Sequence, residues 1–153
     1  MRDAWPGWYG PGGPGDAEAD LLLRSRRAGL PWGVVALDGG ADGGADERAP
    51  VGTAALGPAS HGAEAGEGPW LLGLLVAPAA RGRGVGSALV AACEAQARLA
   101  GHGRLLASTK AAEGLLRRRG WEEVRRLPDG HLVLAIRLRG GGPALGPPPA
   151  GGR

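Results

Sequence analysis

The sequence feature that most constrains the fold is an apolar strand pattern that runs through a glycine-rich loop into a helix pattern. "WLLGLLV" (residues 70–76) is continuously apolar, which is typical of a central strand buried on both faces. "APAARGRGVG" follows, and residues 87–101 then repeat apolar side chains near helical spacing. A loop of this kind leaves backbone N–H groups free at the helix start. The middle of the chain is therefore a candidate anion-binding site.

The rest of the chain predicts short elements on either side of this centre. Strands are predicted over residues 32–38, 51–56, 104–109, 121–127 and 131–139, and helices over residues 17–28 and 110–120. The last two strands form a hairpin. Residues 1–15 are predicted to be an irregular segment, residues 16–139 one domain, and residues 140–153 a disordered Gly/Pro-rich tail. This order predicts an α/β domain with a mixed sheet and helices on both faces.

Charge is distributed unevenly along the chain. Residues 1–80 carry 5 basic and 10 acidic side chains, whereas residues 81–139 carry 12 basic and 5 acidic ones. The second half would attract a nucleotide phosphate or a nucleic acid. A nucleic-acid binder that uses "RGRG" and the arginines at 117–119 stays open as an alternative. We expect no nucleic-acid partner, because the aromatic side chains lie outside these basic clusters and no base-stacking platform is evident.

Cysteine and histidine content limits metal and redox chemistry. Cys93 is the only cysteine, so neither an intramolecular disulfide nor a cysteine-based metal site can form. His61, His102 and His131 are far apart in the sequence and lack ligand spacing, so we predict no metal site. No signal peptide and no long apolar segment is recognised. We expect a soluble, cytoplasmic protein without a membrane partner.

The glycine-rich loop at residues 81–86, called the glycine loop below, does not match two common nucleotide-binding motifs. A dinucleotide-binding loop has the spacing G-x-G-x-x-G, but Ser87 stands where the third glycine would follow Gly82 and Gly84. A Walker A loop needs a lysine, and none precedes Lys110. What remains is a loop whose glycines admit a phosphate group and whose arginines can pair with it.

The segment "LLGLLVAPAARGRGVGSALVAACEAQA" strongly resembles motif A of the GNAT superfamily, the acetyl-CoA-dependent N-acetyltransferases. That motif is a strand ending in Val-x-Pro, then Arg/Gln-x-x-Gly-x-Gly/Ala, then a helix. "ASTKAAEGLLRRRGWEEV" resembles the family's next block, and the resemblance covers about residues 32–139. It implies a GNAT-like mixed, mostly antiparallel sheet with helices on both faces. The family's first strand and first helix are not recognised before Asp16, so we expect the first strand to be missing.

The resemblance also implies the reaction and the residues that bind the donor. Acetyl-CoA would give its acetyl group to a primary amine of a small molecule or peptide, without a metal, and the family resemblance allows a homodimer. The predicted cofactor-binding residues are Leu74, Leu75 and Val76 for the pantetheine arm, Arg81, Gly82, Arg83, Gly84, Val85, Gly86 and Ser87 for the pyrophosphate, and Thr109 where many members have a CoA-contacting Asn.

The catalytic residues are not identified by the sequence. Many family members have a proton-donating Tyr where this chain has Leu116, which cannot protonate the leaving thiolate. Tyr9, Ser108 or water could replace it. Candidate bases come from the loop before the central strand, where solvated charges are the simpler interpretation: His61, Glu64 and Glu67. A CoA-binding module without catalytic activity therefore stays open as an alternative.

Overall fold

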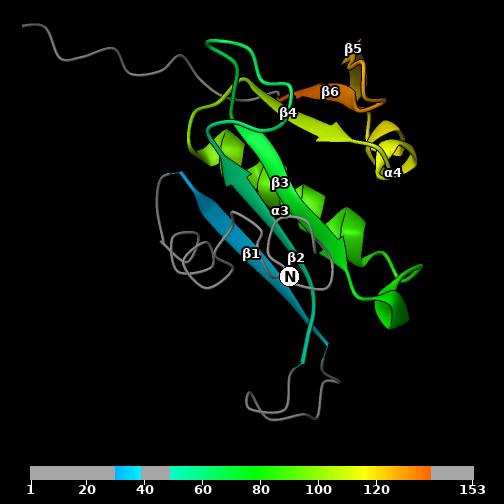
Figure 1. Cartoon of the computed structure of the whole chain (residues 1–153). Coiled ribbons are helices and arrows are strands. Elements are labelled where there is room, and N and C mark those ends of the chain that lie inside the picture. The colour runs from blue at the N-terminus through cyan, green and yellow to red at the C-terminus, as the bar shows by residue number, and fades with distance from the viewer. Residues whose placement is uncertain (1–29, 39–48, 139–153) are drawn as a thin grey trace, which may run out of the picture.

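A computed structural model describes residues 30–38 and 49–138 (Figure 1). Its elements are β1 (Trp32–Asp38), β2 (Ala49–Gly57), β3 (Trp70–Val76), the 3-10 turn η2 (Pro78–Ala80), α3 (Val85–Leu99), β4 (Arg104–Thr109), α4 (Glu113–Arg118), β5 (Glu122–Arg126) and β6 (Leu132–Arg137). The strands form one sheet in the order β1-β2-β3-β4-β6-β5. Only β3 and β4 pair in parallel within this sheet. The predicted mixed, mostly antiparallel sheet is confirmed.

The predicted strands and the central helix are found where the sequence places them, but α4 is shorter than the predicted helix over residues 110–120. The Thr109 hydroxyl accepts hydrogen bonds from the backbone N–H groups of Ala111 and Ala112, at 3.1 and 2.9 Å. This local capping turn holds residues 110–112 outside the helix. The predicted helix over residues 17–28, the irregular segment 1–15 and the tail 140–153 lie outside the described residues.

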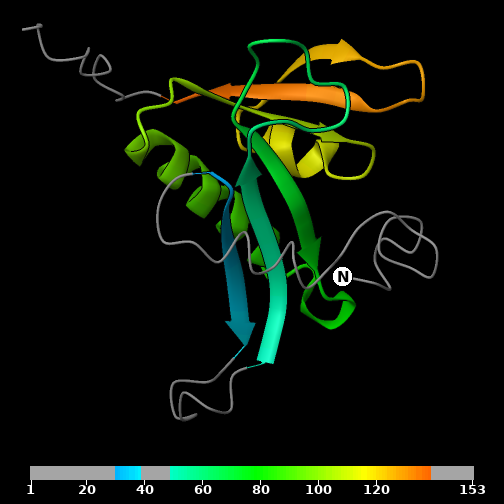
Figure 2. The same cartoon turned by 60° about the vertical axis from the view of Figure 1, so that its left-hand side comes forward.

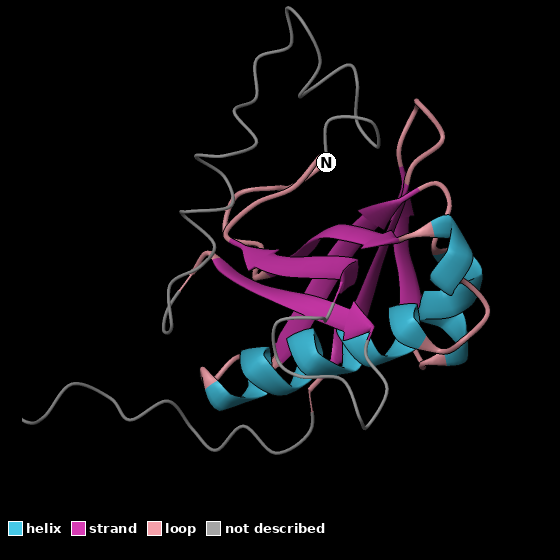
Figure 3. Ribbon diagram, turned by 90° about the horizontal axis from the view of Figure 1, so that it is seen from below, coloured by secondary structure: helices cyan, strands magenta, loops and turns pink. Residues whose placement is uncertain are grey.

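Both described helices lie on one face of the sheet (Figure 3). The larger core cluster lies between this face and the helices and includes Leu89, Val90 and Cys93 of α3 together with Leu116 of α4. Burial raises the pKa of the Cys93 thiol to about 12, so this side chain packs as a small apolar group rather than acting as a nucleophile. A smaller cluster on the opposite face contains Trp70, Leu106 and Val133.

The sheet opens between β3 and β4, and this opening shapes the middle of the molecule. The two strands pair only at Trp70 with Leu106 and at Leu71 with Ala107. Beyond that point β4 turns away from β3, as Figures 1 and 2 show. On its other side, β3 contains a bulge, in which Gly73 has φ +56° and the register against β2 shifts. The second half of β3 therefore keeps β2 as a neighbour but has no paired strand on its β4 side.

Candidate functional site

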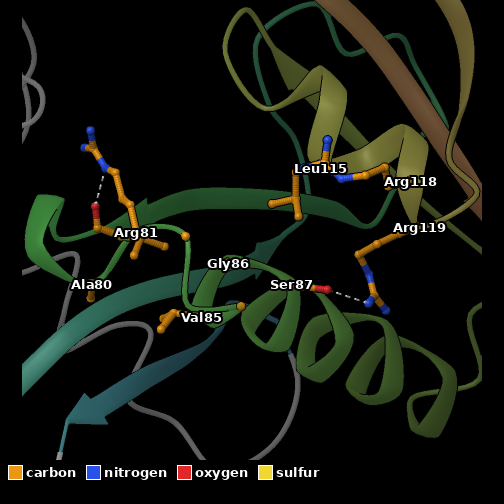
Figure 4. A pocket seen from close by; sticks show the side chains of 11 residues that line it. Ala80, Arg81, Val85, Gly86, Ser87, Leu115, Arg118 and Arg119 are labelled. Atoms are coloured by element: carbon orange, nitrogen blue, oxygen red, sulfur yellow. Dashed lines mark hydrogen bonds between the residues drawn. The ribbon is translucent and has the colours of Figure 1, made fainter.

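A cavity of about 810 Å³ lies at the glycine loop, between the end of β3, the start of α3 and α4 (Figure 4). Its lining residues are Val76, Ala80, Arg81, Gly82, Gly84, Val85, Gly86, Ser87, Leu115, Arg118 and Arg119. The helix starts at Val85, so the N–H groups of its first turn have no partner within the helix. These donors and the positive end of the helix dipole favour an anion here.

Glycines give this loop its shape for two different reasons. Gly82 and Gly84 have φ values of +75° and +81°, a left-handed conformation that other residues rarely adopt. Gly86 allows close packing, because a Cβ atom at this position would lie 3.2 Å from Leu115 Cδ2 of α4 and would push that side chain back by a few tenths of an ångström. The first turn of α3 and helix α4 therefore approach each other closely beside the cavity.

The two loop arginines are held in different places. Arg81 Nε donates a hydrogen bond to the Val76 carbonyl oxygen at 3.1 Å, which fastens the loop to the end of β3 (Figure 4). Arg83 forms two hydrogen bonds to Asp38 of β1, at 3.2 and 3.3 Å, and this carboxylate raises the pKa of the guanidinium. Arg83 is not among the lining residues of the cavity, and its role in pyrophosphate binding stays a prediction.

Two arginines from α4 and its C-terminal end add positive charge to the cavity. The sequence did not predict that they would bind the acetyl donor. Arg118 and Arg119 both line it, and Arg119 Nη1 donates to the Ser87 hydroxyl at 3.1 Å (Figure 4). In sequence, these residues belong to a basic run that is equally typical of a solvated helix face. Only the close packing of α4 against α3 shows that part of the run borders the glycine loop.

A buried carboxylate holds Arg119 in position. Glu94 of α3 is only 7% exposed and accepts two hydrogen bonds from Arg119, at 3.1 and 2.6 Å. It also accepts one from Trp121 Nε1 at 2.9 Å. Glu94 lies four residues after Val90 and three before Ala97, on the buried stripe of the helix. A glutamate on the apolar stripe of a predicted helix indicates a buried carboxylate with a partner, and this pattern could have pointed to the interaction.

A second cavity, of about 330 Å³, lies where β3 and β4 part. Its lining includes Leu74 of β3, Thr109 of β4 and Leu116 of α4, so the predicted tyrosine position does border this space. The Thr109 hydroxyl accepts hydrogen bonds from Ala111 and Ala112 in the turn before α4, as described above. Ser108 also lines the cavity, and its buried hydroxyl has no hydrogen-bond partner in the described structure. Leu75 lines neither of these two cavities.

The three candidate bases form interactions with side chains other than those of the proposed transfer site. Arg125 forms an ion pair with Glu67 at 2.7 Å and also donates to the Gly62 carbonyl, and its hydrogen bonds lower the pKa of Glu67 to about 2. Glu64 lies 3.4 Å from the same arginine. His61 contacts Asp129 instead. None of the three lines the cavity in the described structure.

Two of the three histidines, which are far apart in the sequence, lie together in the structure. The rings of His61 and His131 have centroids 4.7 Å apart, with Asp129 between the two side chains. The 58–69 loop and the turn between β5 and β6, which are distant in sequence, meet beside the smaller core cluster and bring these residues together. His131 also lines the second cavity.

These features define a glycine loop at a helix start and, further back along β3, a slot between two parted strands. The chain matches the family model of the acetyltransferase (GNAT) family over residues 1–121, and it belongs to this family. The match reaches further toward the N-terminus than the resemblance over residues 32–139. A search of curated proteins found no match. None of the helices in the described ranges is long and apolar enough to cross a membrane.

Two solved structures with TM-scores above 0.5 support the fold. An aminoglycoside 6'-N-acetyltransferase complexed with coenzyme A is 18% identical, with a TM-score of 0.64 over 90% of this chain and 86% of that one. The GNAT domain of S. lividans PAT is 24% identical, with a TM-score of 0.59 over 80% of this chain and 69% of that one. The chain spans 56% of a third structure, from Exiguobacterium sp. 255-15, at 17% identity, 59% coverage of this chain and a TM-score of 0.49.

Proposed function

We propose that this protein transfers the acetyl group of acetyl-CoA to a primary amine of a small molecule or peptide. The observation that carries the proposal is the adjacency of the two cavities at the second half of β3. Val76 lines the cavity at the glycine loop, and Leu74 lines the slot between the parted strands. A ligand with a pyrophosphate and a long, thin arm matches that arrangement. The proposal also places the reaction in the cytoplasm, because a single buried cysteine is typical of a reducing compartment.

The chain's own groups would bind and orient the donor. N–H groups of the first turn of α3, with Arg118 and Arg119 opposite, would hold the pyrophosphate. Backbone groups of Leu74, Leu75 and Val76 are the partners proposed for the arm, because β3 has no paired strand on that side. Acetyl-CoA supplies an activated thioester carbonyl.

Transfer needs few further groups. The amine nitrogen would bond to the acetyl carbon while the carbon–sulfur bond breaks, with the N–H of Leu75 or Val76 donating to the carbonyl oxygen. One proton leaves the nitrogen, and the thiolate takes up a proton. Among the described hydroxyl groups, that of Ser108 is our candidate to give the thiolate its proton, because it is buried, lines the slot and lacks a hydrogen-bond partner.

Binding and turnover are tested separately. Acetyl-CoA should raise the melting temperature, whereas ATP and NAD should not. Release of free thiol from acetyl-CoA in the presence of a panel of amines then tests the transfer. Stabilisation without any thiol release would favour the alternative, a CoA-binding module without catalytic activity. Equal stabilisation by ATP would refute both. The homodimer stays a prediction that light scattering can check.

One arginine offers a matched test of the binding site. Arg118→Ala should weaken acetyl-CoA binding about tenfold, the loss expected for one charge-assisted hydrogen bond. Arg126→Ala removes the same charge from an exposed position on β5 that lines neither cavity, and it should bind normally. Calorimetric titration measures both. Equal affinities of the two variants would place the pyrophosphate elsewhere.

A further inference from the structure

The side chains of His61, Asp129 and His131 form a compact cluster that the proposed transfer does not use. His61 Nε2 lies 2.7 Å from Asp129 Oδ2, and His131 Nδ1 lies 2.9 Å from the same oxygen. One donor atom from each residue can be chosen so that all three lie within 4.8 Å of one another. Two imidazole nitrogens therefore flank one carboxylate oxygen at the protein surface.

The carboxylate in this cluster is oriented by the backbone. Asp129 Oδ1 accepts a hydrogen bond from the His131 N–H at 3.1 Å, which leaves Oδ2 directed to the two rings. Hydrogen bonds of this kind orient ligands in protein metal sites. His61 comes from the 58–69 loop, whereas the other two residues come from the turn before β6, so a bound ion would join two distant segments of the chain.

We propose that His61, Asp129 and His131 bind one divalent transition-metal ion of the zinc type, with a coordination position left open. Imidazole nitrogen together with carboxylate oxygen suits Zn²⁺ and its neighbours better than Mg²⁺ or Ca²⁺, which prefer oxygen ligands alone. Three protein ligands are also the number found where zinc keeps a free position.

Metal binding requires the three side chains to rearrange, because the two imidazole nitrogens, which lie within 4.8 Å of each other, must come closer while the carboxylate oxygen moves away from both. Metal–ligand bonds of about 2.0–2.1 Å in a tetrahedral site separate the donor atoms by about 3.3 Å. The two distances to Asp129 Oδ2, 2.7 and 2.9 Å, must therefore each open by about half an ångström. The side chains of His61 and Asp129 are 58% and 43% exposed, so neither is fixed by surrounding packing.

The proposed metal site lies beside the slot between β3 and β4. His131 and Ser60, the residue next to His61, both line the slot. A metal ion would hold the 58–69 loop against the β5–β6 turn at the rim of this cavity. Its open position would accept water or an electron-donating group of a ligand that enters from this side. Metal binding itself does not depend on the proposed acetyl transfer and is measured without it.

Titration of the untagged full-length chain with zinc chloride tests the proposal. We expect one equivalent of Zn²⁺ to bind, and no binding of Mg²⁺. His61→Ala and His131→Ala should each lower the zinc affinity at least about tenfold. His102→Ala is the matched control, because His102 is the only other histidine in the sequence and should leave the affinity unchanged. The buried Cys93 is not a competing ligand, because its thiol pKa is about 12.

Cobalt gives a second readout that does not depend on stability. Co²⁺ should bind to the parent chain and to His102→Ala with a visible absorption band of a four-coordinate ion, and this band should be absent in His61→Ala. Circular dichroism should show that His61→Ala folds, since its side chain is mostly exposed. The absence of saturable zinc binding by the parent chain would overturn the proposal. So would zinc binding that survives in both cluster variants or is lost in His102→Ala.

Discussion

Replacing Glu94 by alanine should destabilise the protein strongly, because this carboxylate is the shared acceptor for two side chains of the core rim. Without it, the Arg119 guanidinium and the Trp121 Nε1–H lose their hydrogen bonds. Removing one partner of a buried ion pair costs about 3–5 kcal/mol. Arg119 keeps 23% side-chain exposure and can be partly hydrated, so we expect a loss of about 2–4 kcal/mol. At about 4 °C per kcal/mol, the melting temperature should fall by about 8–16 °C.

Urea unfolding of the parent and of Glu94→Ala measures the difference in the free energy of unfolding. Glu113→Ala is the control, because its 2.8 Å ion pair with Arg117 is exposed and should contribute only about 0–1 kcal/mol. A loss in Glu94→Ala no larger than in this control would refute the reasoning. The double variant Glu94→Ala/Arg119→Ala should lose less than the sum of the two single losses, because no uncompensated charge remains. Strict additivity would show that the two side chains do not interact.

Three further changes test other parts of the structure. Glu67→Gln should be less stable than the parent at pH 7, because a carboxyl with a lowered pKa stabilises the fold when it is ionised. Thermal unfolding should show that this difference in stability shrinks as the pH falls from about 4.5 to about 2. A difference that stays constant over this pH range would contradict the reasoning. Gly84→Ala should lose about 1–2 kcal/mol of folding stability, because alanine is strained in the left-handed conformation, although no atom lies within 4 Å of the new Cβ. The affinity for acetyl-CoA should fall as well. Unchanged stability and affinity would argue against a role of Gly84 in shaping the loop. Leu116→Tyr should cost about 1–3 kcal/mol by overpacking a side chain that is 1% exposed, without raising the rate of thiol release, and a faster variant would contradict this.

Local patterns in the sequence predict the strands and the central helix well, because each of these elements has a clear apolar period and a glycine or proline at its end. The shortened α4 depends on one hydroxyl, that of Thr109, which competes with the helix for backbone donors. Long-range pairing is harder to predict. The ion pair of Glu67 with Arg125 and the cluster around His61 join segments about 60 residues apart, and no single-sequence period records such contacts.

The glycine loop shows the same limit within the candidate site. Its backbone shape follows from glycines that the sequence displays directly. The positions of the arginines around the loop cannot be read from the motif. Arg83 of the loop bonds to Asp38 of β1, whereas Arg119, from the end of α4, bonds to Ser87 of α3. Which cations border an anion site is decided by the packing of whole elements, which a motif does not encode.

The bulge at Gly73 keeps the apolar side chains of β3 on one face, although β3 has one residue more than the facing stretch of β2. Side chains of a regular strand alternate strictly between the two faces, and one extra residue exchanges the faces of all residues that follow. Leu71 before the bulge and Leu74 and Val76 after it all belong to the helix-covered core, which an unbroken alternation would not allow. Deleting Gly73 would place Leu74 opposite Ala54 in a regular strand, so Leu71, Leu74 and Val76 would still face the core and only the bulge would be lost. A one-residue insertion between Leu74 and Val76, which no bulge absorbs, would exchange the faces of the residues that follow and should be tolerated far less than the deletion of Gly73.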